Sequence, residues 1–99
     1  MPFAEQPAES ISAYHILPVL LPSHVDRVAV IASLKGKGIQ SSIHYPPFWS
    51  FTAYADQFSP TQAPVLAEIC DRQLTLPLFP TMTPAEVDKV TNVLLKAIK

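Results

Sequence analysis

Apolar positions along the chain follow two different periods, which predicts a fold that mixes strands and helices. Residues 13–22 form an apolar run with strand character. Pro18 lies inside this run and has no backbone N–H, so we expect an edge strand or a bulge there. Residues 39–45 alternate apolar and polar side chains before two prolines, which predicts a half-buried second strand. Residues 74–80 predict a short third strand.

Three other segments carry apolar side chains at helical spacing. The first helix is expected to start at the signal in residues 23–26 and to end at the Lys-Gly-Lys-Gly sequence of residues 35–38. A second helix should open near Pro64. The last is the clearest, because Thr83 can cap it and Glu86 can complete a capping box.

The order strand, helix, strand, loop, helix, strand, helix predicts an α+β fold, a two-layer α/β sandwich. We expect a small sheet of about three strands with helices packed against it. Residues 11–99 should form this one domain. Residues 1–10 are polar and contain prolines, and we expect a flexible lead-in or the remnant of a linker.

Composition narrows the classes of function. The chain has 99 residues, 48% of them apolar, with a formal net charge of -1, which disfavours a disordered tail and a nucleic-acid binder. No basic and apolar leader or membrane-spanning run is visible, so neither export nor membrane insertion is predicted. A single cysteine, Cys70, excludes an internal disulfide and favours a cytoplasmic setting. The three histidines are too widely spaced for a metal site.

Catalytic chemistry is not indicated by any motif. Gly36–Gly38 follows a helix instead of leading into one, so it predicts helix termination and not a phosphate loop. No arrangement of Ser, Cys, His and Asp suggests an activated nucleophile. The lysines fall at expected helix ends or polar faces, so none is a candidate to bind a cofactor covalently. We therefore predict no catalytic residue, and a small independent enzyme is disfavoured.

The segment Ile43–Tyr54, with the sequence IHYPPFWSFTAY, is the most informative part of the chain. It places polar-tipped rings in a loop after a strand, where binding groups are commonly displayed. Ordinary packing in a core or interface explains it equally well. Stacking on a nucleobase is disfavoured because the chain offers no basic track for a phosphodiester backbone.

Taken together, the sequences SAYHILPVLL, LKGKGIQSSIHYPPFWSFTAY and ICDRQLTLPLFPTMTPAEVDKV resemble the carboxyl-terminal part of the DegT/DnrJ/EryC1/StrS aminotransferases. The resemblance covers residues 12–99 and is specific as an ordered set. It implies the small domain of a fold-type I enzyme, usually a homodimer, which uses pyridoxal phosphate to transfer an amino group from glutamate to a nucleotide-linked keto sugar.

In that family the catalytic lysine and the phosphate cradle lie in a large amino-terminal domain, so the resemblance implies that this chain holds no cofactor itself. The missing large domain and a nucleotide sugar are then the expected partners. The small domain closes over the site, which implies substrate contacts for His44, Tyr45 and Tyr54. Trp49 stands where relatives usually have a histidine, and it joins them as a candidate contact.

Two hypotheses follow. In the first, the chain is a lid and substrate-recognition domain that is inactive alone. In the second, it is a free-standing interaction or oligomerisation module derived from such a domain, whose aromatic loop and apolar surface mediate docking.

Overall fold

The computed structural model describes residues 8–99 and has the expected α+β fold. The elements in chain order are β1 (Leu17–Leu20), α1 (Arg27–Gly36), the 3-10 turns η1 (Phe48–Ser50) and η2 (Pro60–Gln62), α2 (Pro64–Arg72), β2 (Gln73–Leu76) and α3 (Pro84–Ala97). A lead-in was predicted for residues 1–10, of which residues 1–7 lie outside the described part of the chain. Residues 8–10 are exposed.

The sheet is smaller than the sequence predicts. β1 and β2 pair antiparallel, with Leu17 opposite Leu76 and Leu20 opposite Gln73. The strand predicted for residues 39–45 is reduced to one antiparallel bridge between Ser42 and Thr75. The backbone N–H and C=O of Thr75 both bond Ser42, at 2.8 and 3.0 Å. Two strands and one bridge therefore replace the three strands expected in the described chain.

Pro18 fits this arrangement because of the register. It lies opposite Thr75, whose backbone groups point to the other side, toward Ser42. In an antiparallel ladder such a pair exchanges no hydrogen bond, so the missing N–H of Pro18 costs the sheet nothing. The edge position predicted for this proline is confirmed, since β1 pairs only with β2 among the described residues.

Helix α1 has well-defined ends. Asp26, the last residue of the predicted start signal, is its N-cap, and the Asp26 carboxylate accepts a hydrogen bond from the N–H of Val28 at 2.8 Å. At the other end, Gly38 has φ of 71°, and the N–H of Ile39 donates to the carbonyl of Leu34 at 3.0 Å. These are the features of a Schellman motif, in which a residue past the helix end takes the left-handed conformation that glycine adopts freely.

Apolar residues from the sheet, α1 and α3 form one core. Leu74 and Leu76 lie on the same face of β2 and gather with Val30 and Leu34 of α1 and Val90 of α3. Leu34 and Leu74 are completely buried. The predicted capping box of α3 is confirmed, with Thr83 and Glu86 bonding reciprocally. We call this part of the molecule, β1, β2, α1 and α3, the body.

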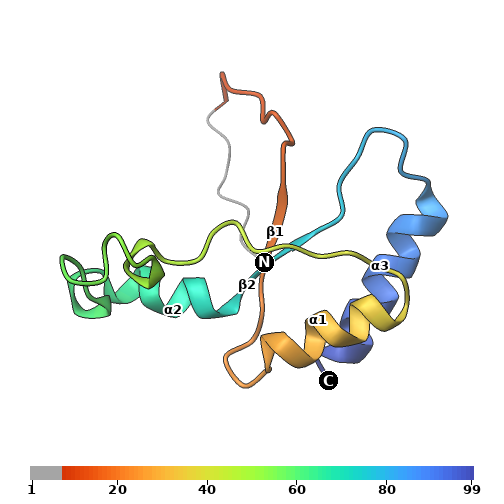
Figure 1. Ribbon diagram of the computed structural model, residues 1–99. Helices are drawn as coiled ribbons and strands as arrows, with labels where there is room; N and C mark the ends of the chain where they lie inside the picture. Colours follow the sequence, from red (N-terminus) through yellow and green to blue (C-terminus); the bar gives the residue numbers. More distant parts are fainter. Residues whose placement is uncertain (1–7) are drawn as a thin grey trace.

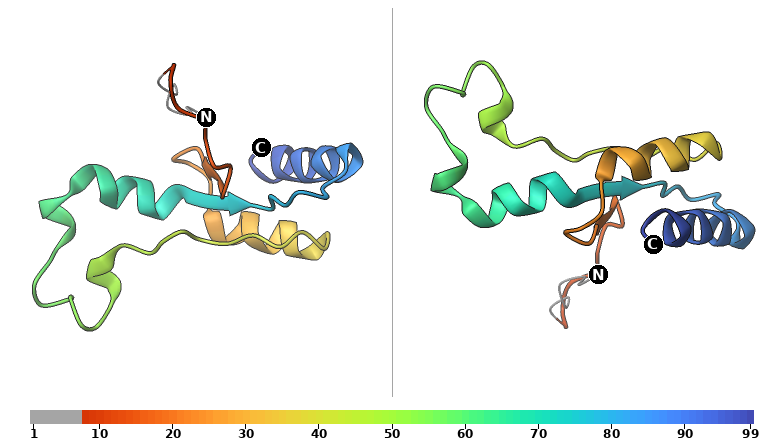
Figure 2. Two further views of the ribbon diagram at one scale, coloured as in Figure 1. Left: turned by 90° about the horizontal axis from the view of Figure 1, so that it is seen from above. Right: turned by 90° about the horizontal axis from the view of Figure 1, so that it is seen from below.

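One long segment of the chain projects from the body (Figure 1). Residues 45–72, which we call the arm, extend to one side and return through α2, which runs directly into β2 (Figure 1). The same separation is visible from above and below (Figure 2). The radius of gyration is 15.5 Å, whereas a compact chain of this length has about 13 Å. The arm adds no residue to the core of the body.

Candidate functional site

His44 lies where the chain leaves the body to form the arm, and its position is set by two polar residues of β2. The backbone N–H of His44 donates to Oε1 of Gln73 at 3.2 Å, and Nδ1 of its ring lies 3.0 Å from Oγ1 of Thr75. Nε2 of Gln73 donates to the same Oγ1 at 3.0 Å. Gln73 and Thr75 are buried, and the three side chains close a small ring of hydrogen bonds. His44 is therefore held by both its backbone and its ring.

A pocket of about 530 Å³ opens beside this network. Its polar lining comes from four parts of the chain: His15 before β1, Gln40, Ser42 and His44 before the arm, Thr75 of β2, and Glu86 and Lys89 of α3. Apolar lining residues include Ile39, Leu76 and Val90, which also belong to the core. The pocket thus joins an apolar floor to several hydrogen-bonding groups, a combination typical of sites for small polar ligands.

The charged edge of the pocket lies on α3. The N–H of Thr83 donates to the Glu86 carboxylate at 2.8 Å, as does the Thr83 hydroxyl at 2.8 Å. These two hydrogen bonds, and to a lesser degree the positive charge of Lys89, lower the pKa of Glu86 below its ordinary value. Glu86 is therefore ionised at neutral pH and already occupied with its own helix end.

The other three predicted site residues lie in the arm and outside this pocket. Tyr45 follows His44, and the two rings meet edge to face with centroids 5.0 Å apart. Tyr45 is 73% exposed. Trp49 packs on Phe48 at 5.1 Å, and Tyr54 lies 6.3 Å from Phe58. The structure therefore brings His44 and Tyr45 together, and it places Trp49 and Tyr54 in a separate aromatic cluster with Phe48 and Phe58.

The apolar side of α2 is only partly covered. Cys70 is buried, and its Sγ lies 3.9 Å from the carbonyl oxygen of Tyr45. Val65, Leu66 and Ile69 are 70%, 38% and 40% exposed. Within the described chain, the arm carries apolar residues at helical spacing without a core to receive them.

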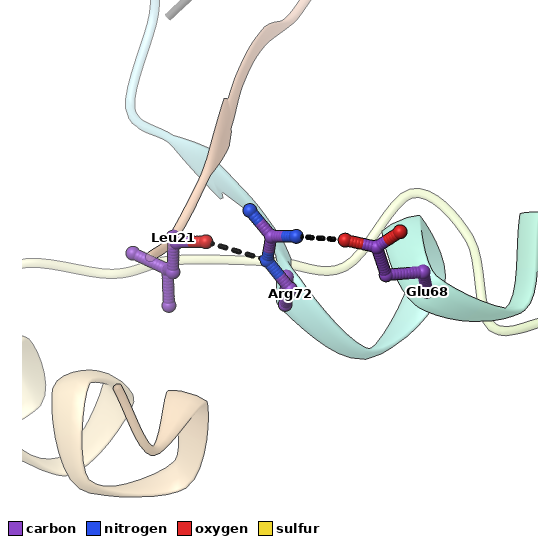
Figure 3. Close-up of polar contacts among 3 residues, drawn as sticks. All are labelled: Leu21, Glu68 and Arg72. Atoms are coloured by element: carbon purple, nitrogen blue, oxygen red, sulfur yellow. Dashed lines mark hydrogen bonds and ion pairs between the residues drawn. The ribbon is translucent and has the colours of Figure 1, made fainter. Parts of the chain in front are cut away.

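Two arginines connect the arm to the body, and nothing in their sequence context points to this role. Nε of Arg72 donates to the carbonyl of Leu21 at 2.8 Å, and the same guanidinium contacts Glu68 one helical turn away (Figure 3). Arg27 of α1 reaches the carbonyl of Cys70, and also that of Gln73 at 3.2 Å. Arg27 thus bonds backbone carbonyls at the junction between α2 and β2, and Arg72, at the end of α2, bonds the carbonyl of the residue that follows β1.

The lysines do not fit a resident pyridoxal phosphate. A lysine that binds this cofactor covalently must be desolvated over it, yet Lys35, Lys37, Lys89, Lys96 and Lys99 are all exposed. Lys89 is the member of this set that reaches the pocket. The N-termini of α1 and α3 bond their own carboxylates, from Asp26 and Glu86, so neither is open to a phosphate group.

The described residues, 8–99, contain neither a metal-binding cluster nor a membrane-spanning helix. No cluster of three or more metal-ligating side chains is present there. No helix within that range has the length and apolar character needed to cross a membrane.

Comparison with known proteins gives the class to which this fold and sequence belong. The sequence model of the DegT/DnrJ/EryC1/StrS aminotransferase family matches residues 1–95. The chain belongs to this family, and the resemblance noted from its motifs is confirmed.

Solved structures of Spr1654 from Streptococcus pneumoniae, described as a sugar aminotransferase, are similar in fold. The form with pyridoxamine phosphate has a TM-score of 0.78 at 26% identity over 84% of this chain. The apo form has a TM-score of 0.78 at 27% identity, and the pyridoxal phosphate form 0.73 at 27% identity over 86% of the chain. This chain spans only 22% of the length of the first two structures and 24% of the third.

Proposed function

We propose that the chain is the C-terminal lid and substrate-recognition domain of a pyridoxal-phosphate-dependent nucleotide-sugar aminotransferase. In this proposal the cofactor and its lysine belong to a larger domain outside the chain, which by itself catalyses no amino transfer. The setting is the cytoplasm, where a free, buried Cys70 stays reduced. The full enzyme would act as a homodimer.

The observation that carries the proposal is the fixed position of His44. A histidine that lines a pocket and is held by two buried side chains is prepared to meet a ligand, because little rotamer freedom remains to be lost on binding. The exposed ring of Tyr45 and the aromatic cluster, in which Tyr54 is exposed and Trp49 is half-buried, lie on the segment that follows directly. Tyr and Trp supply large contact areas with a polar edge, which suits a sugar or a base.

The uncovered apolar side of the arm supports the same proposal. Val65, Leu66 and Ile69 would be buried against the larger domain, which accounts for a helix whose apolar face is only partly covered in the described chain. The alternative function, a free-standing interaction module, rests on the same surface. It predicts self-association of the chain and no response to a nucleotide sugar.

A titration of the purified chain with a panel of nucleotide sugars tests the proposal. Trp49 is the single tryptophan, so its fluorescence reports on the arm, while NMR follows the ring signals of His44 and Tyr45. We expect a saturable change with at least one nucleotide sugar, and we expect His44→Ala to weaken it. His24→Ala is the matched control, because His24 is exposed and lies outside the pocket.

Three results would contradict the proposal or one of its parts. Absence of any response, together with concentration-dependent dimers in sedimentation, favours the interaction module. An equal effect of the two histidine variants removes His44 from the site. A Schiff-base absorbance band after addition of pyridoxal phosphate, with turnover of glutamate, overturns the division of labour between two domains.

A further inference from the structure

In the ring of hydrogen bonds around His44, the donor and the acceptor of each bond can be assigned in turn. The N–H of the His44 backbone can only donate, so the Gln73 atom that faces it is the amide oxygen, Oε1. This fixes the orientation of the Gln73 amide. The other end of the amide, Nε2, then donates to Oγ1 of Thr75. Thr75 thus receives one hydrogen bond and still has its own hydroxyl proton to give.

The proton of Thr75 has one acceptor. Of the described residues, only His44 offers a further partner to Oγ1, through Nδ1 at 3.0 Å. If the hydroxyl donates to Nδ1, that nitrogen accepts and carries no proton. The remaining proton of the neutral imidazole then lies on Nε2, because which nitrogen is protonated is set by the hydrogen bond that the other makes.

Nε2 of His44 is left free for a ligand. No partner for this atom exists in the described part of the chain, and no buried polar side-chain atom there lacks a partner, so Nε2 reaches the solvent. His44 also lines the pocket. The ring therefore offers a donor whose direction is set from behind by Thr75 and, through Thr75, by Gln73.

We propose that Thr75 and Gln73 are positioning residues that hold His44 as the Nε2–H tautomer, so that the domain presents a fixed neutral donor to an acceptor oxygen of a bound ligand. Neither residue needs to touch the ligand. The tautomer can be tested without any ligand, whereas its use in recognition rests on the function proposed above. For a nucleotide sugar, the acceptor is a sugar hydroxyl or a diphosphate oxygen.

Nitrogen-15 NMR of the histidine rings in the whole chain tests the tautomer directly. At a pH above 8, where an ordinary imidazole is neutral, we expect the shift of a bare, hydrogen-bonded nitrogen for Nδ1 and that of a protonated nitrogen for Nε2. A correlation across the hydrogen bond should connect the Thr75 hydroxyl proton to Nδ1. A protonated Nδ1 in the unmodified chain would overturn the proposal, whatever the variants do.

Thr75→Val removes the hydroxyl at nearly constant volume and leaves the backbone bonds to Ser42 in place. We expect the Nδ1 signal to move toward that of an unbonded imidazole, and Thr75→Ser to restore it. Gln73→Leu should cause a smaller shift in the same direction, because Thr75 then loses the donor that orients it. An unchanged Nδ1 signal in a folded Thr75→Val chain would also contradict the proposal.

Ligand titrations separate the positioning role from a structural one. In a chain that binds a nucleotide sugar, Thr75→Val should weaken binding about three- to tenfold, the effect of one hydrogen bond, and Thr75→Ser should not. Comparison with the matching nucleoside diphosphate distinguishes the two acceptors. If Thr75→Val weakens the binding of both ligands, His44 donates to a diphosphate oxygen. If it weakens only the binding of the nucleotide sugar, His44 donates to a sugar hydroxyl. Correct tautomers with no binding would refute the proposed function and leave the positioning of His44 intact.

Discussion

The body and the arm are built from similar apolar residues but differ in what covers them. In the body, Leu34 and Leu74 are fully buried between β2 and two helices. In the arm, Phe48 and Phe58 meet with ring centroids 4.8 Å apart, yet they remain 38% and 39% exposed. Burial of apolar surface is the main source of folding stability. The body therefore stabilises itself, whereas the arm depends more on its junction with the body.

The largest expected difference in stability is between a side-chain truncation in the body and one in the arm. Leu34→Ala leaves a cavity under α1 and should lower the free energy of unfolding by about 2–5 kcal/mol. Phe58→Ala removes a half-exposed ring and its contact with Phe48, for which we expect a loss of about 0.5–1.5 kcal/mol. Urea denaturation followed by circular dichroism measures both.

Hydrogen exchange provides the control for this pair of variants. Amides of the arm should exchange faster than those of β2 and α3 in the unmodified chain, because local opening exposes few buried contacts there. Equal losses of stability in the two variants, with equal protection of arm and body, would contradict the division into two regions.

The sequence predicted those features of the body that depend on near neighbours. The capping box of α3 joins Thr83 to Glu86, three residues away, and the end of α1 is set by Gly38. The prediction of a strand over residues 39–45 was wrong, and the reason lies in contacts with residues distant in the sequence. Ile39 turns into the core as part of the helix end, Ser42 makes the single backbone bridge of this segment to Thr75, and the chain then leaves the sheet for the arm. Alternation alone does not indicate how far a partner strand extends.

In the candidate site, too, local sequence patterns did not reveal contacts between residues that are distant in the sequence. The resemblance pointed to His44, which the structure places at the pocket. Thr75, which bonds the His44 ring, lies 31 residues further along the chain, and no local pattern relates the two. Alternation in Gln-Leu-Thr-Leu does place the side chains of Gln73 and Thr75 on one face of a strand. Polar residues in a short apolar strand are thus the signal that could have directed attention to β2.

An intermediate effect on stability is expected at the junction between the two regions. There, substitutions of Arg72 and of Glu68 can be compared (Figure 3). The Arg72 side chain is 23% exposed, and its Nε bonds the carbonyl of the buried Leu21. Arg72→Met leaves that carbonyl without its charged donor, and we expect a loss of about 1.5–3 kcal/mol in the free energy of unfolding.

Glu68→Gln tests the other half of the contact. The Glu68 side chain is 66% exposed, so its ion pair with Arg72 should contribute no more than about 0.5 kcal/mol. Added salt should abolish this small effect while the effect of Arg72→Met persists. If Glu68→Gln is as harmful as Arg72→Met, the ion pair and not the bond to Leu21 holds the arm to the body.

The smallest expected effect is a dependence of stability on pH that arises from one residue of the body, Glu86. The hydrogen bonds from Thr83 lower the pKa of Glu86 in the folded chain below the ordinary value of 4.5. The ionised carboxylate therefore favours the folded state above that value, and this contribution is lost as the pH falls through the lowered pKa. The stability difference between the unmodified chain and Glu86→Gln should shrink from pH 7 to pH 3, measured by urea denaturation. Asp88→Asn, on the same helix, controls for the loss of a charge. A difference that stays constant over this range would show that Glu86 stabilises α3 through its packing and not through its charged capping bonds, and the end of the helix nearest the pocket would then be insensitive to acid.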